Sequence, residues 1–182
     1  MVGGSTTRKL LLRVVGPGLA GFGVEGVLPA ARLELYRSGQ LVASANDWDE
    51  VQARAAETAS IASQVGAFAL KPGSRDSSLL VDLLPGAYTM VAASQTTGSG
   101  IALVEAYDAD GSRTSGTERL VNIATRARAG AGDTALIAGF VVSGSVPKQL
   151  LIRGIGPGLV QFGVDEVLLT TELSVYAGDR MI

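Results

Sequence analysis

The stretch LLLRVVGPGL, residues 10–19, decides how this chain is organised, because it occurs twice. Its apolar run, closed by a Gly-Pro-Gly turn, predicts a strand at Arg8–Val15. The stretch returns as LLIRGIGPGL at residues 150–159, and 14 of the 27 positions from residue 10 to 36 are identical to those 140 residues later. The chain therefore contains two copies of one segment.

A period of 140 residues is too long for a solenoid repeat and matches the size of a whole domain. We expect residues 8–147, one full period, to form a β-sandwich domain, and residues 148–182 to be the truncated start of the next repeat. Both copies carry the same apolar pattern, so each needs an apolar surface or sheet edge to bury it. The second copy is expected to pack on the domain or on a partner chain, with its Gly-Pro-Gly turn shaped like the first.

The composition favours a mainly β fold. Apolar residues make up 47% of the 182, mean hydropathy is +0.32, and 24 glycines and 6 prolines separate short apolar runs. This spacing is typical of short strands joined by turns. We predict an antiparallel β-sandwich, jelly-roll or immunoglobulin-like, of eight or nine short strands, with a barrel as the alternative. One short helix is predicted near residues 49–64, with Asp47 or Asp49 as its N-cap and Gly66 as its end.

The other predicted strands follow the apolar runs of the sequence. Residues 32–36 and 40–45 are expected to form a hairpin, and residues 78–84 and 87–94 a second hairpin around Pro85-Gly86. The remaining strands are expected at residues 100–107, 119–125, 135–142 and 149–155.

The composition also excludes several classes of function. The chain has no cysteine and no histidine, so it cannot build a Ser-His-Asp, Cys-His or thiolate metal site alone. Its net charge is −2 without a basic stripe, which argues against nucleic acid. No apolar run reaches about 18 residues, so no membrane span is expected. We expect a protein that is not an enzyme.

Gly16-Pro-Gly18-Leu-Ala-Gly21 has the G-x-G-x-x-G spacing of dinucleotide-binding turns. Such a turn requires a helix directly after it, whose N-terminal amides bind pyrophosphate. Gly23, Gly26 and Pro29 would break that helix, and the second copy has Gln161 in place of the third glycine. The motif is therefore predicted to be a structural turn.

Asp108-Ala-Asp110-Gly111-Ser112 is the best candidate for a metal site. Alternating carboxylates before a glycine bend are how calcium loops present oxygens to one ion. Further ligands could come from Glu105 or from Asp47, Asp49 and Glu50. The same motif is typical of an ordinary polar turn, so two alternatives stay open: calcium bound by Asp108 and Asp110, or no cofactor.

Trp48 is the candidate ligand-binding residue. It is interpreted as an anchor between the first hairpin and the helix, with stacking on a sugar ring as the alternative. Glycoside hydrolysis would need only two carboxylates, such as Glu105 with Asp47 or Asp49. A sugar cleft usually carries more aromatic side chains than this chain offers, at 5% of its residues.

Arg13 and Arg153 occupy equivalent positions inside apolar strands of the two copies. An arginine is costly to bury there without a partner. We expect a structural ion pair or an edge position, with a role at the junction between repeats as the alternative.

Four phrases carry a resemblance to a known class of repeat: LLRVVGPGL, GAFALKPGSRDSSLLVDLLPGAYT, GIALVEAYDAD and RLVNIATRARAGAGDTALIAGFVVSGSVPKQLLIRGIGPGL. From Arg8 onward the chain resembles a repeat unit of large secreted or surface proteins of environmental bacteria. LPGAYT and VEAYD also resemble parts of the β-sandwich accessory domains that follow secreted peptidases. The resemblance implies export and a modular, non-catalytic role, and it carries over no site residue.

Together these patterns favour a structural or adhesive module of an extracellular or cell-surface repeat protein. The alternative is a module that binds polysaccharide or calcium, and a carboxylate-based hydrolase is less favoured. The expected partners are neighbouring repeats of the same protein, a second copy through the repeated strand segment, or a polysaccharide.

Overall fold

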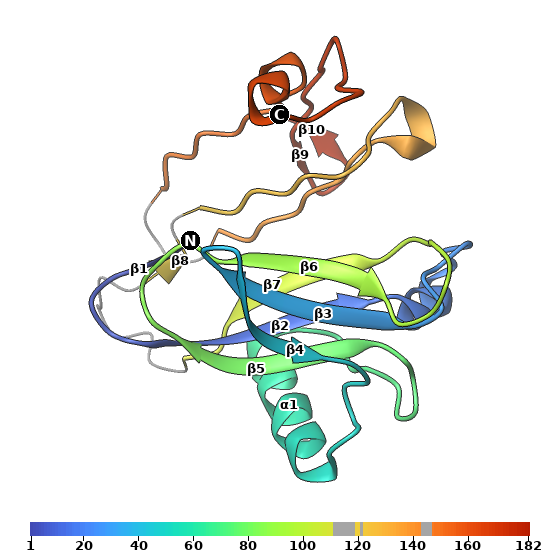
Figure 1. Ribbon diagram of the computed structural model, residues 1–182, viewed down its shortest axis with the longest axis vertical. Helices are drawn as coiled ribbons and strands as arrows, with labels where there is room; N and C mark the ends of the chain where they lie inside the picture. The colour runs from blue at the N-terminus through green and yellow to red at the C-terminus, as the bar shows by residue number, and fades with distance from the viewer. Residues whose placement is uncertain (111–118, 121, 143–146) are drawn as a thin grey trace. The chain divides into compact units, whose positions relative to one another are not determined.

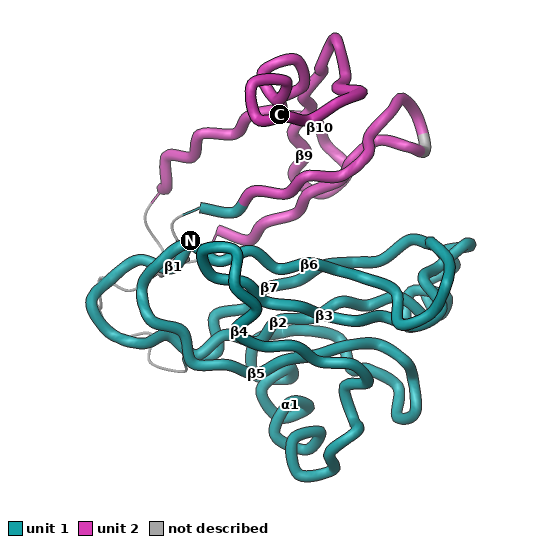
Figure 2. The backbone as a smooth tube through the Cα atoms, in the orientation of Figure 1, with its two compact units in different colours: residues 1–123 teal, residues 124–182 magenta. Residues whose placement is uncertain are grey.

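The computed structural model describes residues 1–110, 119–120, 122–142 and 147–182 (Figure 1). The chain divides into two compact units, residues 1–123 and residues 124–182, which Figure 2 shows in different colours. Antiparallel strands predominate in the described residues, and one α-helix accompanies them. The prediction of a mainly β fold is confirmed. The expected boundary at residues 147 and 148 marks the sequence period, and it stays a prediction.

The first sheet of unit 1 is built around β2 (Arg8–Val15), whose bounds are those predicted from the sequence. β2 pairs antiparallel with β5 (Ser77–Leu83) on one side and with β7 (Leu103–Asp108) on the other. Its last six residues are all buried, so both of its faces are covered. A near-continuous apolar run is the pattern that such a strand requires.

In the second sheet of unit 1, β3 (Ala31–Arg37) lies between β4 (Gln40–Ala45) and β6 (Thr89–Ser94). The predicted hairpin around Ser38-Gly39 is confirmed as β3–β4. Both turn residues have positive φ, 51° and 79°. That conformation matches the twist of the strands in a two-residue hairpin turn.

The second predicted hairpin is wrong. β5 and β6 follow each other in the sequence, but β5 pairs with β2 and β6 pairs with β3. The Pro85-Gly86 turn therefore carries the chain from one sheet to the other. A Pro-Gly pair specifies a turn, but it does not specify that the strands on either side pair with each other.

Three strands predicted towards the C-terminus are absent or shortened. Of residues 119–125 only β8 (Arg119–Leu120) is a strand, paired with β1 (Val2–Gly3), and residue 121 lies outside the described residues. Residues 135–142 and 149–155 form no strand in the described chain. Both have the apolar pattern of a strand, but a strand also needs a neighbour that accepts its backbone hydrogen bonds.

Alternate residues of β2 serve two apolar clusters. Leu10, Leu12 and Val14 lie in one cluster with Leu33 of β3, so this cluster contains residues of both sheets. Leu11 points the opposite way and packs against α1 (Gln52–Val65), which lies below β5 in the view of Figure 1. Leu11 is 0% exposed. Burial of a leucine side chain of this kind stabilises a fold by about 2 kcal/mol.

The predicted end of the helix is confirmed, but its predicted cap is wrong. Gly66 ends α1 in the left-handed conformation, at φ 77°, and its N–H bonds to the last turn. At the other end Val51 is the N-cap, without a side-chain hydrogen bond. Asp49 does not cap the helix because its Oδ2 accepts the N–H of Gly73 at 2.7 Å.

A buried carboxylate holds the Gly-Pro-Gly turn, which forms the 3₁₀ helix η1 (Pro17–Phe22). Asp76 is fully buried, and its Oδ1 accepts the N–H of Gly16 at 2.8 Å and of Gly18 at 3.1 Å. A Cβ on Gly16 would lie 2.4 Å from the carbonyl oxygen of Leu28, and one on Gly18 2.9 Å from Asp76 Oδ2. Both glycines are therefore required, and the motif is a structural turn rather than the start of an α-helix.

The residues on either side of this carboxylate connect both sheets. The carbonyl of Asp76 accepts the N–H of Trp48 at 2.9 Å, and the carbonyl of Arg75 accepts that of Ala31, at the start of β3, at 2.8 Å. The Ser77 hydroxyl donates to a carbonyl of β4 at 2.9 Å. The start of β5 is therefore the point where β2, β3, β4 and the segment before α1 are joined.

Unit 2 repeats the turn of the first copy. Its 3₁₀ helix η3 (Pro157–Phe162) begins after Gly156, whose φ and ψ of −112° and −84° are close to the −113° and −78° of Gly16. A Cβ on Gly156 would lie 2.1 Å from the carbonyl oxygen of Leu168, the residue equivalent to Leu28. The expectation that the two turns have similar conformations is confirmed.

The likeness extends beyond the turn. Glu166 has φ 52°, and its equivalent Gly26 has φ 65°. β9 (Tyr176–Ala177) pairs with β10 (Arg180–Met181) in the register that β3 keeps with the start of β4. The repeated segment therefore has the same backbone conformation in both units at the 3₁₀ helix and at residue 26 or 166, and the same pairing register in the hairpin.

We predict that Asp76→Ala lowers the free energy of unfolding by about 2–4 kcal/mol. The change leaves two buried N–H groups without their charged acceptor. Urea unfolding, followed by circular dichroism, measures the loss. Asp82→Ala, on the exposed side of β5, is the matched control and should cost less than about 0.5 kcal/mol. Equal losses from the two variants would show that the carboxylate does not hold the turn.

Candidate functional site

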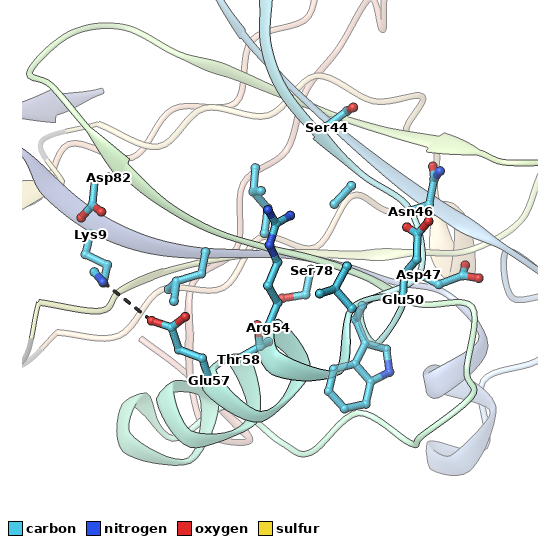
Figure 3. Close-up of a pocket in the computed structure, with 15 residues that line it drawn as sticks. Lys9, Ser44, Asn46, Asp47, Glu50, Arg54, Glu57, Thr58, Ser78 and Asp82 are labelled. Carbon is cyan, nitrogen blue, oxygen red and sulfur yellow. Dashed lines mark ion pairs between the residues drawn. The ribbon is translucent and has the colours of Figure 1, made fainter.

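The candidate site is a pocket of about 480 Å³ between β4, β5 and the start of α1 (Figure 3). Most of its lining is polar. From α1 the Arg54 side chain extends into the middle of the pocket, between Ser44 and Ser78 in this view. Asn46, Asp47 and Glu50, from the segment before α1, lie at one end. The pocket is therefore rich in hydrogen-bond donors and acceptors.

Trp48, the single tryptophan, is half-buried and lines this pocket. Its Nε1 donates to the carbonyl of Lys71 at 3.2 Å, and its ring packs with the cluster of Val15, Leu19 and Leu70. These contacts support the interpretation of Trp48 as an anchor before α1. Its indole N–H is occupied, so a ligand in the pocket would meet the ring rather than that donor.

The charged groups of the pocket are only partly paired. Lys9 Nζ lies 3.9 Å from Glu57 Oε1, a weak surface pair. Asp47 Oδ1 accepts the side-chain amide of Gln95 at 2.8 Å. Within the described residues, Arg54 and Asp82 form no ion pair. The carboxylate of Glu50 forms none there either, so one positive and two negative side chains are free to bind a polar ligand.

Asp108 and Asp110 are brought together, but their carboxylates face an arginine. Asp108 Oδ2 accepts the Nε of Arg8 at 2.9 Å, and Asp110 Oδ2 lies 3.5 Å from Nη1 of the same guanidinium. Asp110 N also donates to Asp108 Oδ1 at 3.2 Å, which closes a polar turn. Gly111 and Ser112 lie outside the described residues. A calcium ion would have to displace Arg8, and calcium binding here stays a prediction.

The other acidic candidates do not gather around one point. The described residues contain no group of three or more Asp and Glu side chains placed to hold a metal ion. Glu105 lies on β7, whereas Asp49, in the segment before α1, accepts the backbone N–H of Gly73.

No helix in the described part of the chain could span a membrane.

Arg13 and Glu105 form the most buried ion pair of unit 1. Arg13 is fully buried, and its Nε lies 3.0 Å from Glu105 Oε2 on the neighbouring strand. Its Nη1 donates to the carbonyl of Phe68 at 2.8 Å, and the guanidinium lies 4.4 Å from the centre of the Phe68 ring. The expected structural ion pair is present at this position.

Tyr107 completes that pair from the same strand as Glu105. Its hydroxyl donates to Glu105 Oε1 at 2.6 Å. Burial, and then the hydrogen bond to this carboxylate, raise the pKa of Tyr107 to about 12. The hydroxyl therefore stays protonated at neutral pH and serves as a donor to the carboxylate.

Several residues of the site were not predicted from the sequence. Arg54 and Asp82 are single charged residues on a helix and a strand, and nothing in one sequence distinguishes them from other surface charges. Asp76 comes just before a strand, where an acidic residue is common. Its contact with Gly16 spans 60 positions, so no local pattern could reveal it.

Comparisons with protein-family models, curated proteins and solved structures gave no match to this chain. The function is therefore argued from the residues and contacts of the chain itself.

Proposed function

We propose that this chain is a non-catalytic structural module of a repeat-built extracellular or cell-surface protein. The observation that carries the proposal is that the two copies share the conformation of the Gly-Pro-Gly turn and of the left-handed residues Gly26 and Glu166. The buried ionisable groups of unit 1 support it, since Asp76 holds a turn and Arg13 is paired with Glu105. Both contacts join segments that are far apart in the sequence, as structural contacts do.

The proposed fold of the module is an antiparallel β-sandwich. Two three-stranded sheets contribute to one apolar cluster, with Leu12 from one sheet and Leu33 from the other. Sheets that bury their apolar faces against each other in this way form the two layers of a sandwich. The Pro85-Gly86 turn connects strands of different sheets, which favours a sandwich. In a meander it would connect two strands that pair with each other.

The test is mechanical. Four copies of residues 8–147 joined head to tail should unfold one at a time when stretched by an atomic force microscope. Each event should release about 450–500 Å of chain, the extended length of one period. A single copy is the control and should give one event. Irregular events, or a smooth extension without peaks, would show that the period is not a structural module.

A second candidate function, binding of a polysaccharide, is supported by the pocket beside Trp48. The pocket combines an aromatic ring with the unpaired charges of Arg54 and Asp82. Sugars are bound by such combinations of a flat apolar ring and polar groups that fix their orientation. A module of this kind would adhere to a surface rather than only extend a chain.

Because Trp48 is the single tryptophan, its fluorescence reports on this pocket alone. If the pocket binds sugar, titration with soluble xylan, β-glucan or alginate should change the emission, and Arg54→Ala should weaken binding about tenfold, which is about 1.4 kcal/mol. Gln64→Ala, on the same helix outside the lining, should bind like the original chain. Unchanged emission with all three polysaccharides would contradict binding at this pocket.

A further inference from the structure

The two copies differ in burial although they share a backbone. Leu11 is 0% exposed in unit 1, whereas its equivalent Leu151 in unit 2 is 85% exposed. Further equivalent positions are buried in the first copy and 38–52% exposed in the second: Leu150, Ile152, Ile155, Leu168 and Leu173. The segment 149–177 therefore presents an apolar face that no other described residue of unit 2 covers.

The polar groups of this face also lack the partners that the first copy has. Arg13 is fully buried against Glu105, whereas its equivalent Arg153 is exposed and forms no ion pair in the described residues. No carboxylate there takes the place of Asp76 at Gly156 and Gly158. A partner that binds as in the first copy must therefore supply two acidic side chains. One would pair with the Arg153 guanidinium, and the other would accept the N–H groups of Gly156 and Gly158.

One contact inside the second copy has no equivalent in the side chains of the first. Gly154 and Thr171 replace Val14 and Ala31, so side-chain volume is lost from one position and added at the other. The Thr171 hydroxyl donates to the carbonyl of Gly154 at 3.4 Å, so the two positions are in contact. This contact joins the residues that follow the apolar run to the residues that lie 17 positions later, but within residues 147–182 only Gly156 is buried.

We propose that the segment 149–177 is a docking surface for the α1–β5–β7 half of a further repeat of the same kind. It binds in the register that β2 keeps with β5 and β7, with a glutamate beside Arg153 and an aspartate at the amides of Gly156 and Gly158. The first copy carries the argument, because it shows the equivalent residues covered by this set of elements. The inference rests on the proposed repeat architecture and deepens it by naming the partner of the exposed face.

The test attaches a second α1–β5–β7 half to the C-terminus of the full chain. Ile182 is equivalent to Val42, so a second copy of residues 43–123 attached after Ile182 continues the period in register. Scanning calorimetry of the extended chain should show a second cooperative transition that the original chain lacks. Arg153→Glu should abolish this transition, and Glu105→Arg in the attached copy should restore it, since the pair is then reversed.

Two leucines of equal exposure give the matched control. Leu151 is 85% exposed and Leu169 is 83% exposed, but Leu169 is equivalent to Pro29, which is exposed in the first copy. In the extended chain Leu151→Asp should remove the second transition, and Leu169→Asp should leave it unchanged. In both chains the transition of unit 1 serves as the internal reference for folding.

Three results would overturn the proposal. The first is an extended chain in which unit 1 melts normally and no second transition exists. The second is an equal effect of Leu151→Asp and Leu169→Asp on the second transition. The third is a dimer of the original chain that Leu151→Asp dissociates, because the occupant would then be a second copy of this chain. The mechanical test of the proposed function is independent, since each of its periods supplies its own residues 8–36.

Discussion

The buried carboxylate of Asp76 is the constraint on which unit 1 depends. One oxygen of a fully buried acid accepts two backbone N–H groups of the turn that follows β2. Its main chain and its neighbours bind β3, β4 and the segment before α1. Because a buried carboxylate is costly without hydrogen-bond donors, the contact of Asp76 Oδ1 with the turn stabilises both. This couples the end of the central strand to the start of its neighbour.

The sequence predicted those features whose cause is local. The apolar run gave β2 its bounds, Ser38-Gly39 gave a hairpin turn, and Gly66 gave the end of α1, because each follows from the conformational preference of a few adjacent residues. Pairing of strands was less predictable. The crossing at Pro85-Gly86 depends on which sheet buries each strand, and that choice is made by contacts between residues far apart in the chain.

The two copies separate these local and non-local causes within one molecule. In both, similar sequences yield the same 3₁₀ helix, a left-handed residue at position 26 or 166, and the same hairpin register. Only in unit 1, where β5 and β7 are present, does the apolar run become a buried strand. The candidate site shows the same division. Trp48 and the aspartates were visible as residue types, but the roles of Arg54, Asp76 and Asp82 follow from the fold.

The central claim is that a carboxylate from a distant strand fixes the turn in the first copy, while the second copy has the same turn without that carboxylate. Amide hydrogen exchange of the equivalent glycines, resolved by NMR, tests it most directly. The N–H groups of Gly16 and Gly18 should exchange only on opening of unit 1, and those of Gly156 and Gly158 should exchange much faster. Equal protection of the two pairs would contradict the account, because Asp76 would then add nothing to what the turn does by itself.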